Sequence, residues 1–147
     1  MIWESFQIIC NNCPDEIIKI FADPSFLLSN LLGVKNIELK DNGTFVGELT
    51  TSTLLGKSRM IINGRVISSL TSATYIVDIV GYGANKGGKI NVKKDGGIIT
   101  IELDLSLPFE IANKGVIMRH IAYFRNNFNE IIRLERIKRK IWQNVCL

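Results

Sequence analysis

The sequence is poor in the residues that most often carry chemistry. Its 147 residues include one histidine, three cysteines and two tryptophans. A structural zinc site needs four ligands, and beside Cys10 and Cys13 only His120 and Cys146 remain as donors. His120 falls within a predicted helix and Cys146 at the chain terminus, so these residues make a poor ligand set. We therefore expect no metal and no cofactor.

Long apolar runs are also absent, since none approaches the ~20 residues that a membrane-spanning helix needs. The first residues, Met1 to Glu4, lack the basic region and apolar core of a secretory signal. A hydrophobic fraction of 46% and a charged fraction of 22% exclude a disordered chain. We expect a cytoplasmic protein that does not span a membrane.

No internal repeat, low-complexity tract or linker divides the chain, and its length is that of one domain. We therefore predict a single domain over residues 1–147. Glutamine is nearly absent, with only Gln7 and Gln143, while isoleucine is frequent. Scarce glutamine and many branched aliphatics are typical of a thermophilic source. An AT-rich genome would produce the same bias.

The hydrophobic pattern predicts the order of the secondary-structure elements. Alternation over residues 2–10 predicts a strand, and two short helices, each opened by a proline, fill residues 14–33. Over residues 34–107 the period is two, and hairpin signals separate six strands. A helix from about residue 115 to residue 144 follows. Consecutive strands joined by short turns favour an antiparallel meander, whose apolar face the long helix covers.

The last predicted helix carries an apolar stripe at helical spacing. The stripe consists of Ile117, Ile121, Phe124, Phe128 and Ile131. The helix would be ~45 Å long, against ~33 Å for a ten-residue strand, so its last turns should overhang the sheet. The overhang carries the apolar residues Leu134, Ile137, Ile141, Trp142 and Val145. Beside them lies a basic cluster that consists of Arg133, Arg136, Lys138, Arg139 and Lys140.

A homodimer interface and a folding-back of these turns onto the chain's own surface explain the overhang equally well. We expect no nucleic-acid partner, because the basic stretch is short and has few aromatic residues between its charges.

Cys10 and Cys13 form a C-x-x-C pair where the first strand meets the first short helix. The same spacing occurs in redox motifs. However, the chain lacks the alternating order of strands and helices that a thioredoxin has. We interpret the pair as two ordinary thiols or as a local disulfide, and its redox state stays open.

His120 precedes Ile121 on the predicted helix and therefore flanks the apolar stripe. Its ring could reach a pocket and act as an acid or base near neutral pH. A partly buried helix residue with one hydrogen bond is the simpler interpretation. Strand parity turns Asp78, Glu102 and Asp104 outward, so we expect none of these carboxylates beside His120.

The element order resembles that of the START and birch-pollen-allergen-like superfamily, the helix-grip fold also called SRPBCC. Two local features carry the resemblance: the paired helices over residues 14–33, and the connection Gly81–Gly88 that precedes the last strand and the long helix. The resemblance implies an α+β fold, in which a seven-stranded curved antiparallel sheet wraps on a long C-terminal helix, with two short helices after strand 1. The chain also resembles an archaeal branch of unknown function.

The superfamily implies binding or transport of a hydrophobic small molecule or lipid in an apolar cavity between sheet and helix. It has no universal catalytic residues, so we assign none and expect a binder rather than an enzyme. The predicted ligand-binding residues are Phe26, Phe45, Met60, Ile62, Tyr75, Val77, Ile79, Ile90, Val92, Ile101, Leu103, Leu105, His120, Ile121, Phe124 and Phe128. Tyr75, His120 and Tyr123 would orient the ligand. Tyr82 and Lys86 lie on a loop that would gate the mouth.

Two other functions fit the same pattern. A polyketide cyclase or aromatase-like enzyme would use the same cavity, with His120 or a tyrosine as acid and base. A protein-interaction module would fill its hollow with its own side chains and act through the overhanging helix. Whether the cavity is open or filled depends on packing that the sequence does not define.

Overall fold

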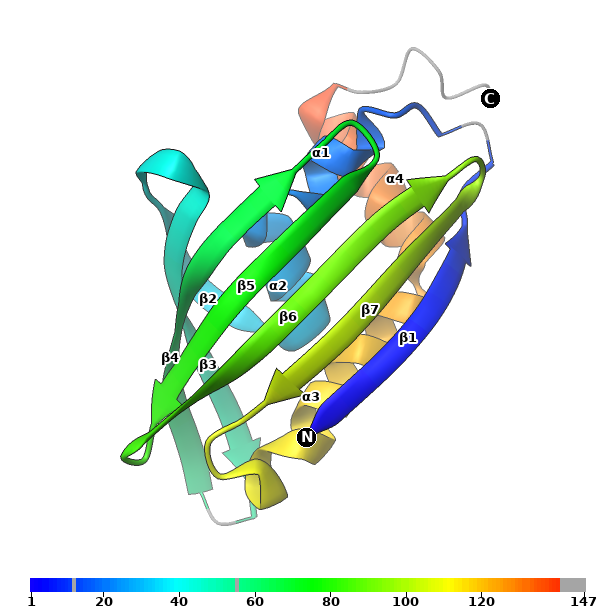
Figure 1. The fold of residues 1–147 in the computed structure, drawn as a ribbon. Helices are drawn as coiled ribbons and strands as arrows, with labels where there is room; N and C mark the ends of the chain where they lie inside the picture. The colour runs from blue at the N-terminus through cyan, green and yellow to red at the C-terminus, as the bar shows by residue number, and fades with distance from the viewer. Residues whose placement is uncertain (12, 55, 141–147) are drawn as a thin grey trace.

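Seven strands form one curved antiparallel sheet in this computed structural model, which describes residues 1–11, 13–54 and 56–140. The strands are β1 (Ile2–Ile9), β2 (Val34–Leu39), β3 (Thr44–Thr53), β4 (Gly56–Ser68), β5 (Ser72–Gly81), β6 (Ala84–Asp95) and β7 (Ile98–Ser106). Their order across the sheet is β1-β7-β6-β5-β4-β3-β2 (Figure 1). From β2 to β7, each strand therefore lies beside the strand that precedes it in the sequence, and β1 pairs with β7. This order confirms the predicted meander.

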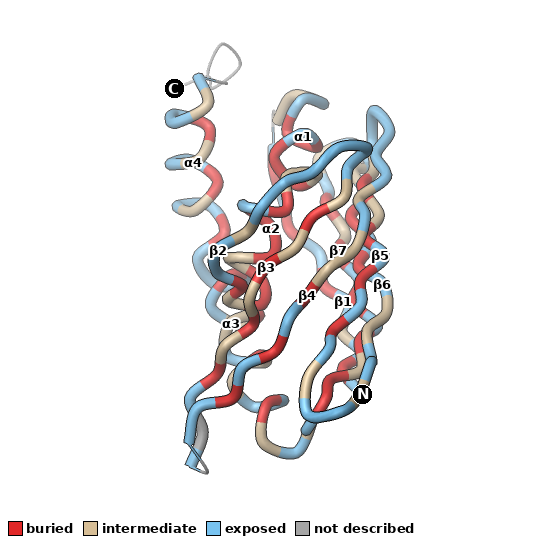
Figure 2. The backbone as a smooth tube through the Cα atoms, turned by 90° about the vertical axis from the view of Figure 1, so that its left-hand side faces the viewer, coloured by how far each residue is buried: buried red, intermediate tan, exposed pale blue. Residues whose placement is uncertain are grey.

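The helices cover one face of this sheet (Figure 1). The described part of the chain contains α1 (Ile17–Phe21), α2 (Pro24–Leu32), a 3-10 turn η1 (Asp41–Gly43), α3 (Glu110–Asn126) and α4 (Phe128–Arg139). Buried and exposed residues alternate along the strands, as Figure 2 shows, so that one apolar face meets the helices. The predicted α+β helix-grip fold, with two short helices after the first strand, is confirmed. Among the described helices, none combines the length and apolar character needed to cross a membrane.

A proline opens α2, as predicted, and a glycine ends it. Asp23 caps the helix by accepting a hydrogen bond from the Ser25 backbone N–H at 2.9 Å, and Pro24 occupies the first turn. Gly33 ends the helix with φ of 75°, a left-handed conformation that glycine adopts without steric cost. A Cβ atom at Gly33 would lie 2.5 Å from His120 Nε2, so the glycine also makes room for α3.

The C-terminal helix is two helices, and the prediction of a single one over about residues 115–144 is wrong in this respect. α3 starts earlier, at Glu110, and Asn127, with φ of −117° and ψ of 18°, separates it from α4. The Asn127 side-chain amide donates to Tyr123 O at 2.9 Å, so it competes with the backbone donors that would continue the helix. Residues 141–147, which include Ile141, Trp142, Val145 and Cys146, lie outside the described residues.

The described part of α4 packs on the chain's own surface. Arg139 forms an ion pair with Asp23 at the start of α2. Arg136 is buried, and its Nη1 atom donates to Cys13 Sγ at 3.9 Å. The predicted basic cluster is therefore partly neutralised and partly packed inside the molecule. A homodimer through this helix stays a prediction.

Candidate functional site

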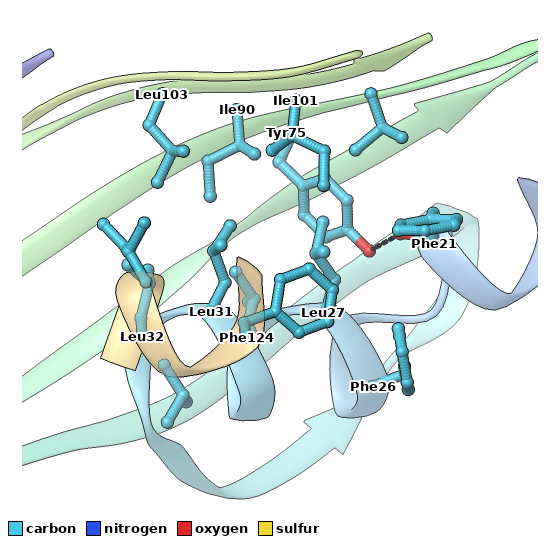
Figure 3. Close-up of a cluster of buried hydrophobic side chains, with 14 of the residues drawn as sticks. Phe21, Phe26, Leu27, Leu31, Leu32, Tyr75, Ile90, Ile101, Leu103 and Phe124 are labelled. Atoms are coloured by element: carbon cyan, nitrogen blue, oxygen red, sulfur yellow. Dashed lines mark hydrogen bonds between the residues drawn. The ribbon is translucent and has the colours of Figure 1, made fainter. Parts of the chain in front are cut away.

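The predicted ligand-binding residues meet in one interior between the sheet and the helices. All of them except His120 are buried and belong to a single hydrophobic cluster. Figure 3 shows part of this interior, where side chains of α2 and α3 face Ile90, Ile101 and Leu103 of the sheet. The alternating pattern thus predicted which side chains point inward, while their contact with a ligand remains a prediction.

Aromatic rings fill the part of this interior near α1. Phe21 stacks on Phe128 and meets Phe26 edge-on, both at centroid distances of 6.0 Å. Phe124 meets Phe26 at 6.1 Å and Phe128 at 5.7 Å, again edge-on. Each such pair contributes about 0.5–1.5 kcal/mol beyond the burial of its area. The rings therefore pack against one another in the space predicted to hold a ligand.

The two tyrosines predicted to orient a ligand have other surroundings. Tyr75 is buried, and its hydroxyl donates to Phe21 O at 2.5 Å (Figure 3). Burial raises the pKa of Tyr75 far above its ordinary range, and the nearby charge of Asp23 raises this pKa further. A ligand could recruit this hydroxyl only by breaking a buried hydrogen bond. Tyr123 is 65% exposed and lies outside the interior.

His120 lies at the junction of α2 and β2 rather than in the apolar cluster. Its half-buried ring rests on Gly33. Burial lowers the pKa of His120, and the positive charges of Arg119 and Lys35 lower it further. The neutral imidazole is therefore favoured. Within the described chain, no carboxylate contributes to this shift, so an acid–base pair with His120 is not assembled here.

We expect the free energy of unfolding to fall as the pH drops below about 6.5. The variant His120→Gln should remove the part of this pH dependence that comes from His120. Because folding lowers the pKa of His120 from 6.5, the unfolded chain binds the proton more readily than the folded one. The stability that depends on neutral His120 is therefore complete above the pKa that His120 has in the unfolded chain. It declines as the pH falls toward the lower pKa of His120 in the folded chain. Urea unfolding of both proteins between about pH 5 and pH 7 measures it. Identical pH profiles would contradict this assignment.

A groove lies between α3 and a free edge of the sheet. β2 pairs with β3 from Leu49 toward the start of β3, which leaves residues 50–53 without a strand on that side. α3 runs beside this edge, and together they border an open groove of about 770 Å³. The lining residues are Ser52, Leu54, Ile111, Ala112, Gly115, Val116 and Arg119. This volume lies within the usual range for small-molecule sites, and the lining is mostly apolar.

A buried polar cluster, formed by Thr51, Ser58 and Asn113, lies directly behind the groove. Thr51 and Ser58 are cross-strand partners in β3 and β4, and the Thr51 hydroxyl donates to Asn113 Oδ1 on α3. The Asn113 amide donates to Pro108 O at 3.0 Å and to Phe109 O at 3.1 Å. These bonds tie α3 to the sheet between the groove and the apolar interior.

Ser58 differs from Thr51 and Asn113 in its hydrogen bonding. Its side chain is buried, yet its hydroxyl oxygen has no hydrogen-bond partner among the described residues. Leaving such a group unpaired costs about 1–3 kcal/mol, so its presence calls for an explanation. A ligand that enters by way of the nearby groove would supply the missing hydrogen-bond partner of Ser58.

The polar cluster was not predicted from the sequence. One signal for it was present. Asn113 lies four residues before Ile117 and thus extends the apolar stripe of the helix by one turn. A polar residue on a buried stripe implies a buried hydrogen-bonding partner.

The C-x-x-C pair is a disulfide between Cys10 and Cys13, one of the two states that the sequence left open. It joins the end of β1 to the segment before α1, at a Cα–Cα distance of 5.6 Å. Among the described residues, no group of three or more His, Cys, Asp and Glu side chains gathers in a way that would hold a metal ion.

Comparison with solved structures finds the same fold in proteins of several organisms. A hypothetical protein from Sulfolobus tokodaii is 26% identical, with a TM-score of 0.72 over 93% of this chain and 98% of that one. A conserved protein from Geobacillus kaustophilus is 14% identical, with a TM-score of 0.60 over 92% of this chain and 94% of that one.

A STAR-related lipid transfer protein from Xanthomonas axonopodis shares the fold at 12% identity, with a TM-score of 0.55 over 90% of this chain and 83% of that one. No curated protein matches the chain significantly. A family model, in contrast, matches residues 1–141, which is nearly the whole length. The chain therefore belongs to the family of this model, and its sheet, paired short helices and C-terminal helices form a START/SRPBCC-like fold.

Proposed function

We propose that the protein binds a hydrophobic small molecule or lipid between the sheet and α3. The unpartnered hydroxyl of Ser58 carries this proposal, because it is a buried polar atom whose cross-strand partner, Thr51, directly precedes the groove residue Ser52. The apolar body of the ligand would lie against the inward-facing residues predicted from the sequence. Its polar end would meet Ser58.

The ligand would reach the interior through the groove. The Thr51–Asn113 hydrogen bond lies behind the groove, so this contact must open or shift for a ligand to pass. Met60 lies beside it, with Sδ 3.8 Å from Asn113 Nδ2. An unbranched methionine side chain changes conformation at low cost, so Met60 is the residue best suited to make room.

The polar end of the ligand is best matched by a neutral oxygen group, such as a hydroxyl or a carbonyl. The polar cluster offers a hydroxyl donor and free oxygen lone pairs but contains no cationic side chain. A carboxylate or phosphate buried there would lack a counter-charge, which is costly in an apolar interior. The name of the Xanthomonas axonopodis relative, a lipid transfer protein, supports a lipid-like ligand class.

A protein-interaction module with a filled core is the second candidate function. The mutual packing of Phe21, Phe26, Phe124 and Phe128 favours it. A cyclase-type enzyme has less support, because Tyr75 is hydrogen-bonded to the backbone and His120 lies away from the apolar cluster.

Titration of the purified, ligand-stripped chain with 1-dodecanol and dodecane tests the binding proposal. Displacement of the fluorescent probe N-phenyl-1-naphthylamine reports binding, and native mass spectrometry reports stoichiometry. We expect one 1-dodecanol per chain, bound more tightly than dodecane. No probe binding and no adduct would overturn the proposal and favour the filled-core module.

We expect Ser58→Ala to weaken 1-dodecanol binding by about tenfold and to leave dodecane binding unchanged. One hydrogen bond is worth up to about 1.5 kcal/mol, and about 1.4 kcal/mol corresponds to a tenfold change in affinity. The same variant should raise the free energy of unfolding by about 1 kcal/mol, because it removes an unpaired buried hydroxyl. Ser5→Ala, on an exposed position of β1, is the matched control. An equal loss for both ligands would contradict the role of Ser58.

A further inference from the structure

Exposed apolar side chains gather at one end of the molecule. The connections β3–β4, β5–β6 and β7–α3 meet there with the N-terminus, at the lower end in Figure 1. The exposed apolar residues of this end are Met1, Leu54, Tyr82, Phe109 and Ile111. We call these five residues the apolar tip. Leu54 and Ile111 are fully exposed and stand on opposite walls of the groove.

The aromatic part of the apolar tip is a pair of rings that contact each other. Tyr82 and Phe109 lie 5.4 Å apart between ring centroids, although they belong to different connections. Both have a left-handed backbone, with φ of 54° and 51°. This conformation is unfavourable for a bulky residue. The two connections therefore present a joined pair of rings to the solvent.

Cationic side chains surround the apolar tip. Lys57 is one residue pair from the end of the β3–β4 hairpin, Lys114 lies in the first turns of α3, and Arg119 lines the groove. Within the described chain, these three residues form no ion pair with a carboxylate. Glu110, the carboxylate of the β7–α3 connection, is paired with the amino group of Met1. This end therefore carries a net positive charge around its apolar residues.

We propose that the apolar tip docks on an anionic lipid surface. Apolar and aromatic side chains on separate loops can enter the headgroup region, and surrounding lysines and arginines attract anionic headgroups. Docking would also place the mouth of the groove, between Leu54 and Ile111, against the lipid. The proposal goes beyond binding in the interior, because docking needs no ligand there.

Flotation of the full, ligand-stripped chain with lipid vesicles tests this docking. We expect binding to vesicles of phosphatidylcholine and phosphatidylglycerol, and much weaker binding to phosphatidylcholine alone. High salt should weaken binding to the anionic vesicles, because it screens the charges. Equal binding to both vesicle types, or no binding to either, would overturn the proposal. Neither result depends on whether the interior binds 1-dodecanol.

The double variant Leu54→Ser with Ile111→Ser should lower partitioning to the anionic vesicles by at least about tenfold, since two apolar side chains no longer enter the lipid. Leu70→Ser is the matched control. Leu70 is 83% exposed on the β4–β5 turn, at the opposite end of the molecule (Figure 1). It should partition like the wild type, and circular dichroism should show all three proteins folded. Equal partitioning of the double variant and Leu70→Ser would refute the role of the apolar tip.

Discussion

Phe124→Ala is expected to lower the free energy of unfolding by about 3–5 kcal/mol, the range for a buried phenylalanine that leaves a cavity. Phe124 is fully buried on α3 and contacts Phe26 and Phe128 edge-on. Its removal takes one aromatic neighbour from each of these rings, and dense surroundings close such a gap only partly. Urea unfolding at neutral pH measures the loss.

The size of this loss reports how tightly the ligand-free interior is packed around Phe124. A loss below about 1 kcal/mol would contradict the prediction, because it would mean that Phe124 borders empty space. Tyr123→Ala, at the exposed neighbouring position, should change stability by less than about 0.5 kcal/mol.

Asn113→Leu is expected to cost about 3 kcal/mol of stability, although leucine has a similar size and suits a buried helix face. The change removes the acceptor of the Thr51 hydroxyl and the donor to Pro108 O and Phe109 O. Buried groups that lose their partners cost about 1–3 kcal/mol each, and part of this cost is recovered if water enters. Urea unfolding gives the loss, and hydrogen exchange should show faster opening where α3 meets β3.

Two variants control the Asn113 experiment. Asn126→Leu makes the same chemical change at an exposed position of α3 and should have little effect. Thr51→Val removes the other partner, and the double variant with Asn113→Leu should be more stable than the sum of the two losses predicts. Additive losses would show that the Thr51–Asn113 bond does not link α3 to the sheet.

Most of the fold could be predicted from the sequence, because its signals are local. The alternation in β5 and β7 defines which side chains face the helices, and that alternation needs only neighbouring residues. The proline and glycine at the ends of α2 act in the same local way. The break at Asn127 escaped prediction because an asparagine inside a helical pattern either tolerates the helix or interrupts it.

The candidate site was predicted only in its apolar part. The inward-facing residues of the strands follow from periodicity, whereas Thr51 and Asn113 lie 62 positions apart and meet only in the folded chain. The unpartnered state of Ser58 likewise depends on every neighbour that surrounds it.

The sequence by itself determined the order of the elements, the meander of the sheet and the apolar face that the helices cover. These features follow from periodicity and turn residues, which act over a few positions. Only the tertiary structure decided that aromatic rings meet in the interior, that His120 rests on Gly33, and that a polar cluster lies behind the groove. Such contacts join distant residues, and their geometry depends on close packing that no local pattern encodes.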